Sequence, residues 1–201
     1  WPVTKSINKH LLPIFDKPMI YYPLFTLMAA DIRQILLITN TDSINSYRNL
    51  LGDGSNYGIE IQYASQDHAS GIVDAFIIGK NFIGQENIAL ILGDNLFHGA
   101  RLGNFLSSYS NISGACVFAY HVNDPTGYGV VEISAEGEVL SLEEKPRTPK
   151  SKYAIPGLYF YDNSVVEIAR QIKPSSRNEL EITDLNLSYL KAKKLKVNVL
   201  Q

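Results

Sequence analysis

The chain has 201 residues, of which 45% are hydrophobic and 19% are charged, values typical of a globular protein. Its net charge of −2 gives no basic field for nucleic acid, and no apolar run approaches the ~20 residues that span a membrane. The one cysteine, Cys116, cannot form an intramolecular disulfide. We interpret it as a small core residue in a reducing compartment, and we expect a cytoplasmic location.

Apolar runs and amphipathic segments alternate along the chain. The apolar runs predict strands at 34–39, 59–64, 88–93, 115–122, 128–134, 139–145, 157–162 and 196–200. The amphipathic segments predict helices at 19–31, 42–51, 71–80, 100–109, 164–172 and 182–193. The alternation predicts an α/β fold with a mainly parallel sheet, to which the closely spaced later strands add an antiparallel part. Because we find no linker or repeat, we predict one domain over 1–201.

The first candidate site lies in an irregular stretch before Pro13 and Pro18. Lys5 and Lys9 stand here, ahead of the first predicted helix. Lysines near the carboxyl edge of a sheet could contact a phosphate, and composition alone favours solvated loop lysines.

The second candidate follows the strand at 59–64 and reads "YASQDHASGIVDAF". Gly71, at the predicted start of a helix, would let the backbone approach a ligand closely. The Gln66 amide both donates and accepts hydrogen bonds, so it could read the edge of a base. His68 has no partner at metal-ligand spacing, and we interpret it as a loop histidine.

The third candidate is Asp94, in "ILGDN" at the end of a buried strand. Ligands of open α/β sheets bind outside the carboxyl ends of strands, and Mg²⁺ prefers carboxylate and phosphate oxygens. The same residues are also good turn formers, so a metal ligand and a plain turn are equally supported here.

The fourth candidate is "LSLEEKPRTPK", where Glu144 and Lys145 follow an apolar strand. Neighbours on a strand point in opposite directions unless the chain bends, and Pro146 supplies a bend. The carboxylate could accept from sugar hydroxyls and the ammonium could pair with a phosphate, although a solvated strand end is the simpler interpretation. Tyr128 and Gly129 could present an aromatic face and bare backbone to a small polar ligand.

Several well-known motifs do not occur in the sequence. It contains no G-x-S-x-G, no H-E-x-x-H, no C-x-x-C, no Walker A motif and no G-x-G-x-x-G. Serine hydrolases, zinc enzymes and ordinary dinucleotide dehydrogenases are therefore disfavoured.

Six stretches, taken together and in this order, resemble the sugar nucleotidyltransferases, and within them the enzymes that make dTDP-glucose. The similarity covers essentially all 201 residues. The stretches are "NKHLLPIFDKPMIYYPL", "LLGDGSNYGIEIQYA", "LILGDNLFHG", "VFAYHVNDPTGYGVVE", "SLEEKPRTPKSKYAIPGLYFYD" and "NELEITDLN".

This resemblance implies a fold and a reaction. The fold is a Rossmann-like mixed sheet with helices on both faces. In the reaction, an oxygen of glucose 1-phosphate attacks the α-phosphorus of dTTP and pyrophosphate leaves, with Mg²⁺ neutralising phosphate charge. The resemblance also implies a homo-oligomer, commonly a tetramer. The net charge and the lack of a long apolar run lead us to expect no nucleic-acid or membrane partner.

The resemblance assigns roles to the residues that match the family. Lys9 is the phosphate-contacting lysine, and Asp94 is the metal-binding aspartate. Gln66 and the backbone near Gly71 read thymine. On the sugar side, the matching positions are Tyr128, Gly129, Glu144 at the glucose hydroxyls, Lys145 at the sugar phosphate, and Gly157 near the glucose. Lys9, Asp94 and Lys145 are the residues that we expect to be catalytic.

The chain also departs from the family pattern. The family's glycine-rich loop G-x-G-T-R-L would stand before Trp1, and its second metal-binding aspartate after Gln201. We therefore expect a piece of a longer enzyme that is inactive by itself. Within the chain, five residues differ from those usual in the family and could alter base or sugar choice: His10, Ala69, Ser70, Asp74 and Pro156.

Two alternatives remain open at this point. One is a related nucleotidyltransferase that uses UTP, CTP or ATP. The other is a catalytically inactive domain that binds a nucleotide sugar.

Overall fold

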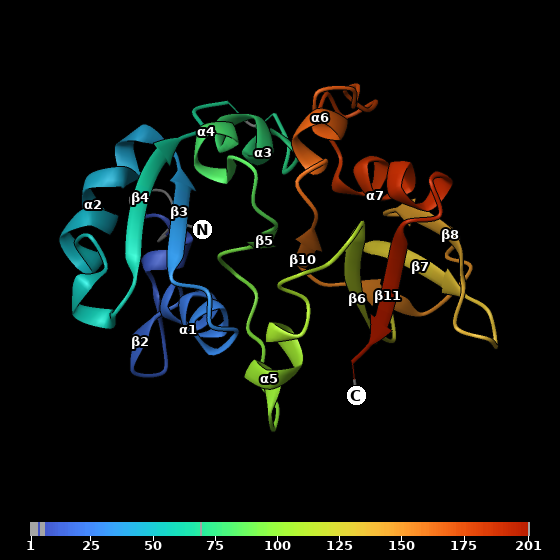
Figure 1. The fold of residues 1–201 in the computed structure, drawn as a ribbon, viewed down its shortest axis with the longest axis horizontal. Coiled ribbons are helices and arrows are strands. Elements are labelled where there is room, and N and C mark those ends of the chain that lie inside the picture. The colour runs from blue at the N-terminus through green and yellow to red at the C-terminus, as the bar shows by residue number, and fades with distance from the viewer. Residues whose placement is uncertain (1–3, 5–6, 69, 201) are drawn as a thin grey trace. The chain divides into compact units, whose positions relative to one another are not determined.

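The computed structural model describes residue 4 and residues 7–68 and 70–200, and these form two compact units (Figure 1). Unit 1 comprises residues 1–69 and 91–108, and unit 2 comprises residues 70–90 and 109–201. The sequence predicts a single domain, and that statement stays a prediction.

Unit 1 is built around a βαβ element. Strands β3 and β4 pair in parallel, with Gln34 opposite Glu60 and Thr39 opposite Ser65, and α2 connects them. Figure 1 shows α2 beside β4. The elements of this unit are the 3-10 turn η2 (Lys9–Leu11), β1 (Pro13–Ile14), β2 (Lys17–Pro18), α1 (Tyr21–Ala29), β3 (Gln34–Thr39), α2 (Thr41–Leu51), the 3-10 turn η3 (Ser55–Tyr57), β4 (Glu60–Ser65) and α5 (Leu102–Ser107).

Unit 2 contains most of a mixed sheet, whose order is β5-β10-β6-β9-β7-β8 with β11 added alongside β6. The pair β6–β11 is parallel, whereas β6–β10, β6–β9, β7–β9 and β7–β8 are antiparallel. The elements are α3 (Asp74–Ile78), α4 (Lys80–Ile83), β5 (Ile88–Ile91), β6 (Ala115–His121), β7 (Gly129–Ile133), β8 (Val139–Glu144), β9 (Tyr153–Ile155), β10 (Leu158–Tyr161), α6 (Val165–Ala169), α7 (Ile182–Lys191) and β11 (Leu195–Val199).

The central strand of this sheet, β6, is almost fully buried. Residues 115–119 of this strand have no exposed surface, which explains why the run "ACVFA" carries no polar side chain. Helix α7 packs its own buried residues, including Leu185 and Tyr189, into the same core, and Figure 1 shows it beside β8. Cys116 is fully buried in β6, as predicted for a small core residue, and burial raises the pKa of its thiol to about 11.

The structure confirms the mixed α/β class and the predicted antiparallel part. The parallel share of the described sheets is smaller than expected. The short strands β1, β2 and β9, which the sequence did not predict, pair antiparallel, and so do the predicted strands β6 and β10. The predicted strands are present, some of them shorter. The helix predicted at 71–80 is divided into α3 and α4, because Gly79 ends one and begins the next.

Candidate functional site

The turn that carries Lys9 is fixed to the carboxyl end of strand β3. The Asn8 side chain accepts the His10 N–H at 3.1 Å, and its Nδ2 donates to Thr39 Oγ1 at 3.5 Å and to Ser43 Oγ at 3.4 Å. Thr39 is the last residue of β3. The short turn therefore stands at the edge of the sheet where α/β proteins bind ligands.

Lys9 and Asp94 form an ion pair, although 85 positions separate them in the chain. The Nζ–Oδ2 distance is 2.5 Å, and Asn95 Nδ2 donates to the other oxygen, Oδ1, at 3.0 Å. Burial raises the pKa of the Asp94 carboxyl, but the hydrogen bond and charge of Lys9 outweigh it, so this pKa lies below its ordinary value. This contact holds the two side chains next to each other.

His10, one of the departures from the family pattern, packs beneath Asp94. Its ring lies so close to Gly93 that an added Cβ would be 2.8 Å from Nδ1, and the same nitrogen is 3.4 Å from the Tyr47 hydroxyl. Burial and the charge of Lys9 lower the His10 pKa, while Asp94 partly opposes them. A side chain at position 93 would therefore collide with the His10 ring, which packs against this turn.

Gln66 lies at the same edge of unit 1. Its N–H donates to the carbonyl of Thr39 at 2.8 Å, one position beyond the end of β4. Unit 1 thus gathers Lys9, Gln66 and Asp94 of the predicted site. Lys5 and Ala69, which were also singled out, lie outside the described residues.

In unit 2 the predicted sugar-side residues cluster around Glu144. Gly129 faces Glu144 directly across β7 and β8, and a Cβ on Gly129 would lie 3.6 Å from Glu144 Oε2. Lys145 leaves the strand with φ +43, so the bend occurs at Lys145 rather than at Pro146, and its Nζ is 3.8 Å from Glu144 Oε1. The structure therefore brings together Gly129, Glu144 and Lys145.

Tyr128 and Gly157 are connected to this cluster through neighbouring residues. The Tyr128 carbonyl accepts the Lys145 N–H at 3.0 Å. The residue is 43% exposed, and its ring meets that of Tyr120 edge-on. Gly157 is buried and lies two residues after Ile155, which pairs with Gly129. Pro156, the departure beside it, accepts the Leu158 N–H. Both predicted residues stay predictions as ligand contacts.

Three residues near Glu144 were not predicted. Thr183 Oγ1 donates to Glu144 Oε2 at 2.5 Å, and Arg177 Nη2 reaches Glu144 Oε1 at 3.3 Å. The buried Glu181 binds the same guanidinium. All three lie in or beside "NELEITDLN", a stretch that resembles the family but whose residues were assigned no role. The signal that the sequence offered for them is a polar run directly before a predicted helix.

The structure explains why position 71 is a glycine, which the sequence did not reveal. Its φ is +101, and a Cβ would lie 2.4 Å from the carbonyl oxygen of Leu180. Two of the departures also act here, since Ser70 Oγ donates to Asp74 Oδ2 at 2.5 Å at the start of α3. Gly71 therefore lets the chain pack closely against the backbone of Leu180. Its contact with a nucleotide stays a prediction.

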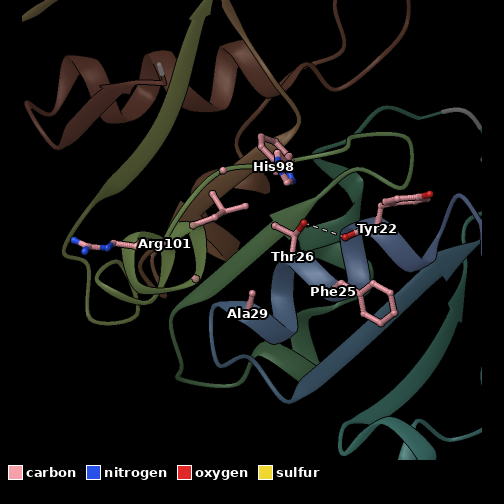
Figure 2. Close-up of a pocket in the computed structure, with 10 residues that line it drawn as sticks. Tyr22, Phe25, Thr26, Ala29, His98 and Arg101 are labelled. Carbon is pink, nitrogen blue, oxygen red and sulfur yellow. Dashed lines mark hydrogen bonds between the residues drawn. The ribbon is translucent and has the colours of Figure 1, made fainter.

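Unit 1 also contains a pocket of about 380 Å³ between α1 and the segment 97–103 (Figure 2). Tyr22, Phe25 and Thr26 line it from the helix, and His98 and Arg101 from the segment. Figure 2 shows the Thr26 hydroxyl directed back to the Tyr22 carbonyl, which it binds at 3.0 Å. The predicted site residues do not line this pocket.

Among the described residues, no three His, Cys, Asp or Glu side chains gather as a metal cluster. None of the helices formed by the described residues is long and apolar enough to cross a membrane.

Comparison with known proteins decides the family. The model of the family described as "Nucleotidyl transferase" matches residues 1–201, which covers both units. The chain belongs to the nucleotidyl transferase family.

Members of this family with known names are similar along the whole chain. The glucose-1-phosphate thymidylyltransferase of Mycobacterium tuberculosis (strain CDC 1551 / Oshkosh) is 56% identical over 200 residues, which are 100% of this chain and 69% of that protein. The enzyme of the same name from Neisseria meningitidis serogroup A is 51% identical over 201 residues, covering 100% of this chain and 70% of that protein.

Solved structures of the family agree in fold. A Bacillus anthracis protein assigned as a glucose-1-phosphate thymidylyltransferase, crystallised with sucrose, has a TM-score of 0.92 at 39% identity and covers 100% of this chain and 81% of its own. A UDP-glucose pyrophosphorylase complexed with UDP-glucose has a TM-score of 0.84 at 30% identity, with coverages of 100% and 85%.

We expect Gly71→Ala to destabilise the protein much more than Gly137→Ala. Both glycines have positive φ, +101 and +87, so both alanines carry a backbone penalty of about 1 kcal/mol. Only at Gly71 does the new Cβ meet backbone atoms, which should bring the loss to about 3 kcal/mol or more. Urea unfolding measures both variants, and equal losses would show that the contact with Leu180 is unimportant.

Proposed function

We propose that this protein transfers a thymidylyl group from dTTP to glucose 1-phosphate, giving dTDP-glucose and pyrophosphate. The observation that carries the proposal is 56% identity with a thymidylyltransferase along the whole chain, against 30% with a UDP-glucose pyrophosphorylase. The lysine–carboxylate pairs support it, because phosphoryl-group transfer depends mainly on positioning and on charge neutralisation.

In the proposed mechanism, unit 1 binds the triphosphate. Lys9 exchanges its contact with Asp94 for a phosphate oxygen, and Gln66 binds the thymine edge through its amide. A magnesium ion fits this set of residues as an ion shared with substrate, because Asp94 supplies one carboxylate and Mg²⁺ is commonly held by one or two carboxylates plus phosphates. When bound, Mg²⁺ would polarise and neutralise the phosphate oxygens.

Unit 2 binds the sugar phosphate in this proposal. The Glu144 carboxylate accepts hydrogen bonds from glucose hydroxyls, and Lys145 pairs with the phosphate. Gly129, which has no side chain, leaves room beside Glu144, and Tyr128 and Gly157 border the sugar. A cytoplasmic location and a homo-oligomer, commonly a tetramer in the family, also belong to this proposal, and they rest on the resemblance.

The base preference of nucleotide-sugar binding tests the proposal. We expect calorimetry to give a dissociation constant for dTDP-glucose at least tenfold below those for UDP-glucose and CDP-glucose. Gln66→Ala should reduce the preference over CDP-glucose about fivefold, because cytosine reverses the hydrogen-bonding pattern that the amide reads in thymine. Gln62→Ala, at an exposed position on β4, the strand that ends just before Gln66, is the matched control. Tighter binding of UDP-glucose would contradict the thymidylyl assignment.

The role of Asp94 predicts opposite effects with and without metal. With Mg²⁺, Asp94→Asn should weaken dTTP binding about tenfold, because the ion loses its protein carboxylate. In EDTA the same variant should bind dTTP at least as tightly as the wild type, because Lys9 is no longer neutralised. Asp16→Asn, which removes the exposed partner of Lys17, is the control. If Asp94→Asn weakens binding equally in both conditions, Asp94 does not hold the metal.

A further inference from the structure

The first residue of helix α2 is attached to the loop that carries Gln66. We propose that Asp67 is a positioning residue for base selection: its carboxylate fixes this loop to Thr41, at the start of α2, and so fixes the backbone from which the Gln66 amide extends. This inference rests on the proposed role of Gln66 in reading thymine, and it concerns unit 1 alone.

Asp67 binds Thr41 through two contacts, one at each carboxylate oxygen. The Thr41 N–H donates to Oδ1 at 2.8 Å, and Thr41 Oγ1 donates to Oδ2 at 2.9 Å. Because both donors belong to one residue, the carboxylate cannot rotate without losing one of them. The N–H and the hydroxyl of Thr41 also lower the pKa of Asp67 below its ordinary value, so the group accepts both hydrogen bonds in its ionised form.

The start of α2 is a suitable anchor for a carboxylate. The first N–H groups of a helix have no partner within the helix, and Thr41 is the first residue of α2. The side chain of Asn40 accepts the Ser43 N–H at 3.0 Å, and Asp67 accepts the Thr41 N–H. A negative charge at this end also interacts favourably with the helix dipole. The loop is therefore attached to a helix of 11 residues rather than to another loop.

The backbone of Gln66 is attached on both sides. Its own N–H donates to the carbonyl of Thr39 at 2.8 Å, one position beyond the end of β4. The next residue is Asp67, whose side chain binds Thr41. With the backbone fixed at both points, mainly the rotamers of the Gln66 side chain remain to be ordered when a base binds. This lowers the entropic cost of binding.

The same segment also anchors the turn that carries Lys9. Asn8 Nδ2 donates to Thr39 Oγ1 at 3.5 Å and to Ser43 Oγ at 3.4 Å. Both parts of the proposed nucleotide site, the turn for the phosphates and the loop for the base, are therefore attached to residues 39–43. This segment sets the distance between them, so releasing the loop changes where the base meets its reader without removing the phosphate contact.

Base preference measures the effect of the Asp67 contact on Gln66. The preference is the dissociation constant of CDP-glucose divided by that of dTDP-glucose, both measured by calorimetry on the whole chain. We expect Asp67→Ala to lower this ratio about threefold. We expect no further loss when Asp67→Ala is combined with Gln66→Ala, because the position of the loop no longer matters once the amide is absent.

The chain offers matched variants on the helix side of the contact. Thr41→Ser keeps both donors and should keep the wild-type ratio, whereas Thr41→Val loses the hydroxyl donor and should lower the ratio about twofold. Asp42→Ala removes an exposed acid from the first turn of the same helix, so it changes the charge near the helix end, and the ratio should stay at the wild-type value. Thr41→Val decides the question if Asp67→Ala does not fold.

Three results would overturn the inference. If Asp67→Ala weakens binding of both nucleotide sugars equally or not at all, while Gln66→Ala lowers the ratio, the contact supports the fold only. If Asp67→Ala lowers the ratio as much in the Gln66→Ala background as in the wild type, Asp67 affects the base without Gln66. If Gln66→Ala itself leaves the ratio unchanged, the proposed base-reading role fails, and this inference fails with it.

Discussion

A lysine ammonium beside a carboxylate is the interaction on which the account of both units depends. Lys9 and Asp94 are 2.5 Å apart in unit 1, and Lys145 and Glu144 are 3.8 Å apart in unit 2. Exposed pairs of this kind contribute only about 0–1 kcal/mol to folding, so stability does not explain them. In the proposed mechanism these pairs exchange partners: a phosphate replaces the carboxylate at the lysine, while a metal ion or a hydroxyl replaces the lysine at the carboxylate.

Glycines beside these pairs let other groups pack closely around them. Gly93 admits the His10 ring next to Asp94, and Gly129 leaves space beside Glu144 and Thr183, whose hydroxyl would be 3.2 Å from an added Cβ. Gly71 meets the backbone of Leu180 in the segment that carries Arg177. In each case the missing side chain lets a polar group or a loop approach a charged residue, so each glycine shapes the surroundings of the site.

The sequence predicts the elements of the fold better than it predicts the contacts of the site. The strands 34–39 and 59–64 follow from their apolar runs and pair in parallel as β3 and β4. The strands β1 and β2 have two residues each, too few for any pattern to be visible. The helix predicted at 71–80 begins late because the positive φ of Gly71 serves packing.

The contacts of the candidate site connect residues that are distant in the chain. No spacing rule joins Lys9 to Asp94, and only the resemblance to a known family suggested that they act together. The bend after Glu144 was attributed to Pro146, but the positive φ belongs to Lys145, a local conformation that composition does not disclose. Arg177 and Thr183 were missed because the residue that they contact, Glu144, lies 33 and 39 positions away in the chain.

The division of the chemistry between the two units is the central claim, and NMR of the labelled chain tests it most directly. Backbone amide shifts would be recorded with dTTP alone and with glucose 1-phosphate alone. We predict that dTTP shifts the amides around Lys9, Gln66 and Asp94, and that glucose 1-phosphate shifts those around Gly129, Glu144 and Lys145. If glucose 1-phosphate shifts only the Lys9 and Asp94 region, or if dTTP leaves that region unchanged, the account is contradicted.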